Sequence, residues 1–235
     1  MADPSPVSFF DRPNSYVGRS PTRPNAKRHL AGRGNFVDDI KLPRMLHAAM
    51  VRSPYAHAEI LSIDISEAKA LPGVVSIITG EDLVDVCKPV VGVLVHLEGL
   101  KSQPQMPLAH GRARWQGEPV VAIAATSRAI AEDAAALVMI DWKELPAVTD
   151  METALDADTP VIHADLGDNH AWHREVISGD VDKAFADAAH VVEETFNFGR
   201  HTGVTLEPRA LVADYNPIEE RMTVHHSGPG PHFFQ

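Results

Sequence analysis

The residues best suited to binding a ligand lie near the end of the chain, in Ser227-Gly228-Pro229-Gly230-Pro231-His232. Two glycines and two prolines after a predicted strand indicate a fixed, extended turn with exposed backbone amides and carbonyls. Because glycine has no side chain, such a turn can approach a ligand closely. The alternative is a Gly-Pro turn that merely connects two elements, and the turn alone does not decide between them.

A second candidate is the segment from His201 to Arg209, which contains an acid and a base two residues apart. Glu207 precedes Pro208 and is therefore held in an extended conformation. Arg209 could pair with Glu207 or with another nearby carboxylate. A catalytic pair and a structural ion pair both fit, and residue type alone favours the structural one.

Histidines are abundant, with thirteen in 235 residues. Two groups stand out, namely His163, His170 and His173 in one loop, and His225, His226 and His232 near the end. Imidazoles suit Zn, Cu or Ni. However, His170 and His173 lie in a segment without a helical pattern, and His225 and His226 would point to opposite faces of a strand. We therefore predict no metal ligated by these side chains.

Composition excludes several classes of protein. Cys87 is the only cysteine, so neither a disulfide within the chain nor a four-thiolate iron–sulfur cluster can form. Gly32-Arg33-Gly34 lacks the third glycine and the preceding strand of a dinucleotide-binding loop. No basic segment followed by an apolar stretch opens the chain, and no apolar run approaches the roughly 20 residues of a membrane span. We expect a cytoplasmic protein.

Charge is unevenly distributed. Residues 1–52 carry nine Lys/Arg and four Asp/Glu, whereas the rest carries twelve and twenty-eight, and the net charge is −11. The basic arm could indicate a nucleic-acid contact. Because an acidic chain opposes phosphate binding, we expect instead that the arm lies on an acidic surface, with no nucleic-acid partner.

The pattern of apolar residues predicts a mixed fold after an extended arm over residues 1–24. Strands are predicted over 45–51, 59–65, 74–79, 119–125 and 138–145, helices over 66–70 and 127–137, and a long loop over 88–117. Ser66 and Thr126 are the expected N-caps. Strict alternation would place Ile60 and Ile63 on opposite faces of their strand.

The second part of the chain looks incomplete. A boundary is predicted near residues 146–160, and beyond it Asp180 should cap a helix with Val181 and Phe185 on its apolar face. Strands are predicted over 191–200, 209–215 and 222–227, the last two joined by a turn at Asn216-Pro217 into an antiparallel hairpin. Three strands rarely make an independent domain. Strands and helices alternate in the first part and strands dominate the second, so the predicted fold class is α/β (α+β).

Eight segments in fixed order resemble the molybdenum-binding large subunit of the xanthine dehydrogenase/aldehyde oxidase/carbon monoxide dehydrogenase family. They are Gly32–Ile40, Leu46–Ala58, Ile63-Asp64 with Leu71–Val74, Gly117–Val120, Ala131–Ala135, Leu145–Val148, Gly179–Val181 with Ala184-Phe185, and Leu206–Ala210. Each segment is weak by itself, but their order and spacing match from about residue 20 onward.

The resemblance implies a hammerhead-type α/β domain over 25–150, followed over 151–235 by the incomplete start of a molybdopterin-binding domain. Members of the family hydroxylate aldehydes or N-heteroaromatic compounds, with water as the oxygen source. A molybdenum–pterin cofactor would then be shared with additional polypeptide, and iron–sulfur clusters and FAD would lie only on partner subunits. The implied partners are the remaining molybdopterin-binding segment or subunit, an iron–sulfur subunit, an FAD subunit and a small-molecule substrate.

Site residues follow from the same resemblance. Gly228, Pro229 and Gly230 would line the cofactor near the molybdenum, with Glu207 and Arg209 as structural support. The family's base is expected beyond Gln235, so no catalytic residue is assigned to this chain. Pro229 stands where many members have a glutamine beside the metal, which removes a side-chain donor. A non-catalytic assembly or scaffold module is therefore the alternative.

Overall fold

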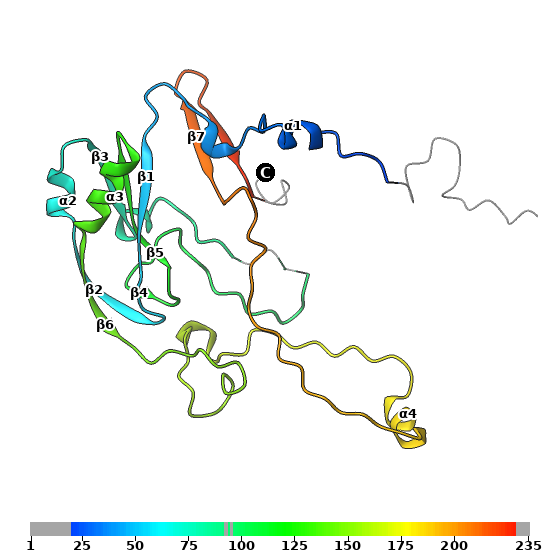
Figure 1. Cartoon of the computed structure of the whole chain (residues 1–235). Helices are drawn as coiled ribbons and strands as arrows, with labels where there is room; N and C mark the ends of the chain where they lie inside the picture. Colours follow the sequence, from blue (N-terminus) through cyan, green and yellow to red (C-terminus); the bar gives the residue numbers. More distant parts are fainter. Residues whose placement is uncertain (1–19, 92–93, 95, 229–235) are drawn as a thin grey trace, which may run out of the picture. The chain divides into compact units, whose positions relative to one another are not determined.

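The computed structural model describes residues 20–91, 94 and 96–228 (Figure 1). The chain divides into two compact units, one of Pro43–Thr195 and the other of the residues up to Leu42 together with those from Phe196. Of the arm expected over 1–24, residues 1–19 lie outside the described part. Residues 20–23 have no regular structure, and a turn at 24–25 leads into the first helix.

The central sheet of the larger unit contains three antiparallel strands in the order β1-β5-β3. They are β1 (His47–Arg52), β3 (Val74–Thr79) and β5 (Pro119–Ala125), and the bounds of the last two match the prediction. Because β5 has a partner on either side, its backbone is hydrogen-bonded along both edges. Its side chains Val120, Val121 and Ile123 are almost fully buried and form the centre of the core.

A second antiparallel sheet has the order β4-β2-β6, with β2 (Ala58–Asp64), β4 (Arg112–Ala113) and β6 (Met139–Glu144). The two-residue β4 and a bridge between Val90 and Gln105 interrupt the long loop predicted over 88–117. Both sheets are antiparallel, so the predicted mixed α/β class is confirmed in its α+β form.

The predicted facing of β2 is wrong. Its register against β6 shifts between Ile60 and Ser62, so Leu61 is an extra residue that is 56% exposed. A bulge of this kind reverses the alternation beyond it. As a result, Ile60 and Ile63 both pack against the core instead of pointing to opposite faces.

Two helices complete the larger unit's core. The helix α3 (Arg128–Ala136) packs on β1 and β5, and α2 (Ser66–Ala70) packs on α3 and β3. Both predicted N-caps are wrong. Ser127, one residue after Thr126, accepts the hydrogen bond from the Ile130 amide at 3.2 Å, and Asp64 accepts at 2.9 Å from the amide of Ser66.

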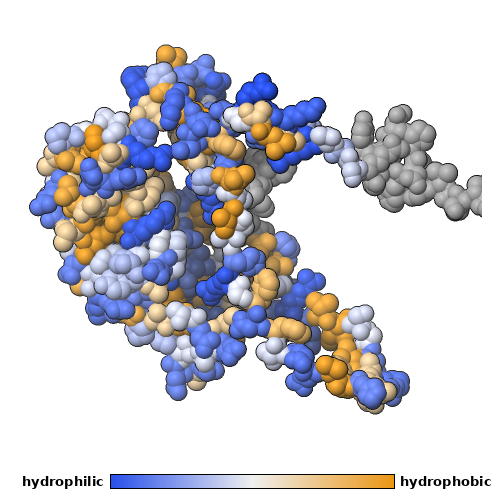
Figure 2. Space-filling view, viewed as in Figure 1, coloured by the Kyte–Doolittle hydropathy of each residue, from blue (hydrophilic) through white to orange (hydrophobic). Residues whose placement is uncertain are grey.

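The rest of this unit contains three short helices, η3 (Glu81–Leu83), η4 (Ala164–Leu166) and α4 (Val181–Asp187). The predicted cap of α4 is confirmed, because Asp180 accepts from the Lys183 amide at 2.9 Å. Its apolar face is not covered within the described residues, since Val181 is 47% and Phe185 61% exposed. Figure 2 shows apolar surface gathered around this helix.

The smaller unit contains α1 (Ala26–Leu30), η2 (Val37–Asp39) and a hairpin of β7 (Leu211–Asn216) and β8 (Arg221–His226). The predicted hairpin is confirmed, and the Asn216 side chain accepts from the amides of Ile218 and Glu219 in its turn. The strand predicted over 191–200 is wrong, because this segment is extended but pairs with no other strand in the described part. Among those same residues, no helix is long and apolar enough to cross a bilayer.

Candidate functional site

Ser227, the first residue of the predicted ligand-binding turn, closes the open end of the hairpin. Its amide donates to the Ala210 carbonyl at 3.1 Å, and its hydroxyl donates to the Pro208 carbonyl at 2.8 Å. The same hydroxyl oxygen accepts from the Ala210 amide at 2.8 Å. One short side chain therefore joins both strands, which fixes where the chain leaves β8.

Gly228 is half-buried, and its amide donates to Nδ1 of His226 at 3.0 Å. Because Nδ1 is the acceptor, a neutral His226 ring carries its proton on Nε2. The predicted site residues Pro229 and Gly230 lie outside the described residues. Of the predicted turn, the structure therefore describes only the start, where Ser227 and Gly228 are held by hydrogen bonds.

An open pocket of about 700 Å³ lies at this end of the hairpin. Its walls are Arg209, Ala210, Leu211, Met222, Val224, His226, Ser227 and Gly228. The apolar walls are largely exposed, with Leu211 at 65% and Met222 at 55%. Such a surface gives one apolar wall with polar groups at one end, as cofactor pockets have.

Glu207 does not form the expected ion pair with Arg209. Its Oε1 accepts instead from the Val37 amide at 3.1 Å, at the start of η2. A carboxylate suits the amides at a helix start, although η2 is a single turn. Glu207 therefore joins the segment before β7 to the Gly32–Ile40 motif, and Arg209 forms no ion pair with any described residue.

Of the histidines singled out in the sequence, His225 and His226 lie in β8, and His232 lies outside the described residues. The rings of His170 and His173 lie 6.4 Å apart, and no group of three or more His, Cys, Asp or Glu in the described part of the chain could hold a metal ion. Cys87 is half-buried and unpaired.

Sequence reasoning missed a polar cluster in the larger unit, around Arg114, Glu118 and His163. Glu118 is only 6% exposed, and its Oε2 accepts from the Arg114 amide at 2.6 Å. Burial raises the pKa of the Glu118 carboxyl, while the amides of Arg114 and Trp115 oppose this effect. Burial also lowers the pKa of His163, and nearby Arg114 and His57 add to the lowering. The GEP motif at 117–119 was the only sequence signal for it.

Two family models match successive parts of the chain. Residues 31–146 match the family described as "Aldehyde oxidase and xanthine dehydrogenase, a/b hammerhead domain", and residues 162–235 match "Molybdopterin cofactor-binding domain". The two matches follow one another along the chain and together cover most of it.

Relatives and solved structures agree with this assignment. The chain is 36% identical over 217 residues to the nicotine 6-hydroxylase large subunit of Paenarthrobacter nicotinovorans, covering 92% of this chain and 26% of that one. It is 36% identical to the carbon monoxide dehydrogenase large chain of Afipia carboxidovorans, covering 87% and 26%. The structure of quinoline 2-oxidoreductase from Pseudomonas putida 86 superposes with a TM-score of 0.84 at 37% identity, covering 92% and 27%.

The chain therefore belongs to the xanthine dehydrogenase/aldehyde oxidase/carbon monoxide dehydrogenase family and corresponds to the N-terminal portion of its molybdopterin-binding large subunit. It spans about a quarter of the length of these relatives.

Proposed function

We propose that this chain supplies the N-terminal portion of the molybdenum-binding subunit of a hydroxylase that oxidises aldehydes or N-heteroaromatic compounds with water as the oxygen source. The observation that carries the proposal is the pocket beside the hydrogen-bonded residues Ser227 and Gly228, at the expected start of the cofactor-contacting sequence. Relatives named for nicotine and quinoline favour an N-heteroaromatic substrate.

The described residues fit a role as one wall of a pterin site. The pocket walls at Leu211, Met222 and Val224 are apolar and exposed, as a surface for a planar ring would be. Arg209 lies at the pocket, forms no ion pair with another described residue, and would hold an anionic group of the cofactor. A molybdenum–pterin group, when bound, supplies the two-electron oxidation of the substrate carbon.

The chain's own residues would position the cofactor and would not react with the substrate. Ser227 fixes the start of the turn, and Glu207 holds the segment before β7 to Val37. Gly228, Pro229 and Gly230 then bring backbone close to the cofactor, and Pro229 offers no side-chain donor. We assign the iron–sulfur clusters to further polypeptide, because this chain has one cysteine and a cluster usually needs four. We propose that the catalytic base and FAD also lie on further polypeptide. We also propose the domain limits 25–150 and 151–235 and a cytoplasmic location.

The test is the molybdenum content of the assembled complex. The chain would be co-purified with the polypeptide that completes the cofactor domain, and molybdenum and pterin would be measured by elemental analysis and fluorescence after oxidation. Gly228→Val should lower molybdenum occupancy severalfold, because a branched side chain would crowd the turn. Ala157→Val, which adds the same branched side chain at an exposed position away from the hairpin, is the matched control. Unchanged molybdenum in Gly228→Val would favour the scaffold alternative.

A further inference from the structure

The larger unit contains a cavity that the proposed function does not use. Its volume is about 300 Å³, and its walls include Gln103, Met106, Arg114, Trp115, Glu118 and His163. It is formed by the loop before β5 and by the segment that leads into η4. We refer to it below as the Arg114 pocket.

Three polar atoms on residues of this wall are buried and have no hydrogen-bond partner: Nε of Arg114, Nδ1 of His163 and Oε1 of Gln103. Buried polar atoms in folded proteins nearly always have a partner, so each exception needs an explanation. Three such atoms around one cavity are positions where a bound ligand would find hydrogen-bond partners. Nε2 of His57, which is 5% exposed and interacts electrostatically with His163, is a fourth such atom.

Arg114 sets the charge of that ligand. Its guanidinium forms no ion pair with a carboxylate in the described part of the chain, and its Nη1 makes only a long 3.4 Å contact with the Arg112 carbonyl. The nearby carboxylate of Glu118 already accepts from the backbone amide of Arg114. A planar guanidinium with free donors suits a carboxylate or a phosphate.

The other charges in the pocket select between these two anions. Glu118 places a carboxylate in the wall, and Glu81, paired with His110 at 2.6 Å, adds another acidic group nearby. A doubly charged phosphate would face more repulsion from these groups than a singly charged carboxylate would. A carboxylate is therefore the better match.

The unpartnered acceptor Oε1 of Gln103 narrows the chemistry of the ligand further. Nε of Arg114 donates, and so does Nδ1 of a neutral His163 ring whose hydrogen lies on that nitrogen. One carboxylate can accept from both. Oε1 of Gln103 needs a donor, which a plain carboxylate lacks but a hydroxyl group on the same ligand has. We propose that the Arg114 pocket binds a small hydroxy-carboxylate, with its carboxylate on Arg114 and His163 and its hydroxyl on Gln103.

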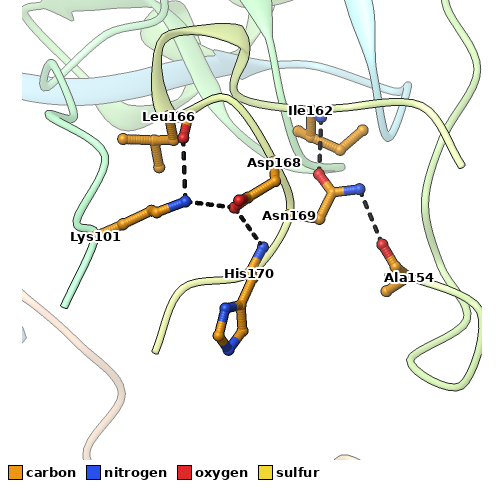
Figure 3. Close-up of polar contacts among 7 residues, drawn as sticks. All are labelled: Lys101, Ala154, Ile162, Leu166, Asp168, Asn169 and His170. Atoms are coloured by element: carbon orange, nitrogen blue, oxygen red, sulfur yellow. Dashed lines mark hydrogen bonds and ion pairs between the residues drawn. The ribbon is translucent and has the colours of Figure 1, made fainter. Parts of the chain in front are cut away.

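The segment that carries His163 is fixed before any ligand arrives (Figure 3). Asn169 accepts from the Ile162 amide at 3.0 Å and donates to the Ala154 carbonyl at 3.0 Å. Lys101 pairs with Asp168 at 2.6 Å and donates to the Leu166 carbonyl at 3.3 Å. These contacts hold the segment around His163 to itself and to Lys101, so binding needs little reordering there.

The experiment is calorimetric titration of the full chain with lactate, propionate and phosphate at one ionic strength. Lactate and propionate differ by one hydroxyl, so the proposal requires lactate to bind several times more tightly, and phosphate more weakly than either. Gln103→Leu should lower lactate affinity to that of propionate and leave propionate binding unchanged.

Arg114→Met should weaken both carboxylates more than about tenfold, because it removes a charge-assisted hydrogen bond. Arg174→Met, at an exposed position outside the pocket, is the matched control. If Arg114→Met does not fold, Arg114→Lys keeps the charge but loses the planar donors, and should still bind lactate less well. The proposal is overturned by lactate and propionate binding equally, by phosphate binding as tightly, or by an unchanged affinity in Arg114→Lys. It does not depend on the molybdenum site, which the measurement does not involve.

Discussion

Replacing Gly80 by alanine would test the packing beneath the Arg114 pocket. A Cβ built on Gly80 would lie 2.3 Å from the carbonyl oxygen of Ala109 and 2.8 Å from its carbonyl carbon. Neither atom can withdraw easily, because Ala109 is 4% exposed and its amide donates to the Pro119 carbonyl at 2.7 Å. Gly80 has φ −59°, so alanine would meet a steric clash and no backbone strain.

The expected loss of stability follows from these contacts. Overpacking typically costs about 1–3 kcal/mol, and a clash with backbone belongs near the upper end. Alanine also reduces the conformational freedom of the unfolded chain, which stabilises the folded protein by about 0.4–1 kcal/mol. We therefore expect Gly80→Ala to lower the free energy of unfolding by about 2 kcal/mol.

Urea unfolding followed by circular dichroism measures this difference. Gly111→Ala is the control, since Gly111 has φ +69° but nothing within 4 Å of a Cβ. Gly111→Ala should lose only about 1 kcal/mol of stability, because alanine is strained in a left-handed backbone conformation. A Gly80→Ala protein as stable as the parent would refute the close approach of Gly80 to Ala109.

Three further outcomes follow from individual contacts. Glu207→Ala should speed hydrogen exchange of the Val37 amide by about tenfold, whereas Glu207→Gln, which keeps an acceptor, should change it less; equal exchange in all three proteins would contradict the contact. Because the pKa of His163 is lowered from 6.5, its neutral form stabilises the fold above that pH, and this contribution is lost as the pH falls through the lowered value. The free energy of unfolding of His163→Gln should therefore depend less on pH below pH 6.5. An unchanged pH dependence would show that His163 does not cause it. Asp180→Ala should destabilise α4 by about 1 kcal/mol, seen as faster exchange of the Lys183 amide, while Asp158→Ala, at an exposed position outside α4, serves as the control.

Sequence patterns located the elements whose causes are local. Val74–Thr79 and Pro119–Ala125 were predicted with the bounds that the structure has, because Gly73 and Pro119 mark their starts and β-branched or small apolar residues fill them. The turn after Asn216 and the cap at Asp180 were also predictable, since each is a side chain bonding to an amide two or three residues away.

Features that depend on distant partners were not predictable. The extra residue at Leu61 exists because of the register between β2 and β6, and alternation within β2 contains no sign of it. Glu207 bonds to an amide 170 residues earlier, which no spacing rule near Arg209 could indicate. The unpartnered atoms of Arg114 and His163 likewise become visible only when two loops meet.

The failed strand over 191–200 bears directly on the proposed function. Its alternation of Val192, Phe196 and Phe198 with polar residues suits a strand, yet these side chains are 83%, 89% and 79% exposed. Burying each would contribute about 1.5–3 kcal/mol, and a strand also needs a neighbour for its backbone. Both requirements point to a surface that the described residues do not contain. Under the proposed function, that surface would belong to the remaining molybdopterin-binding polypeptide, since the chain spans about a quarter of its relatives' length.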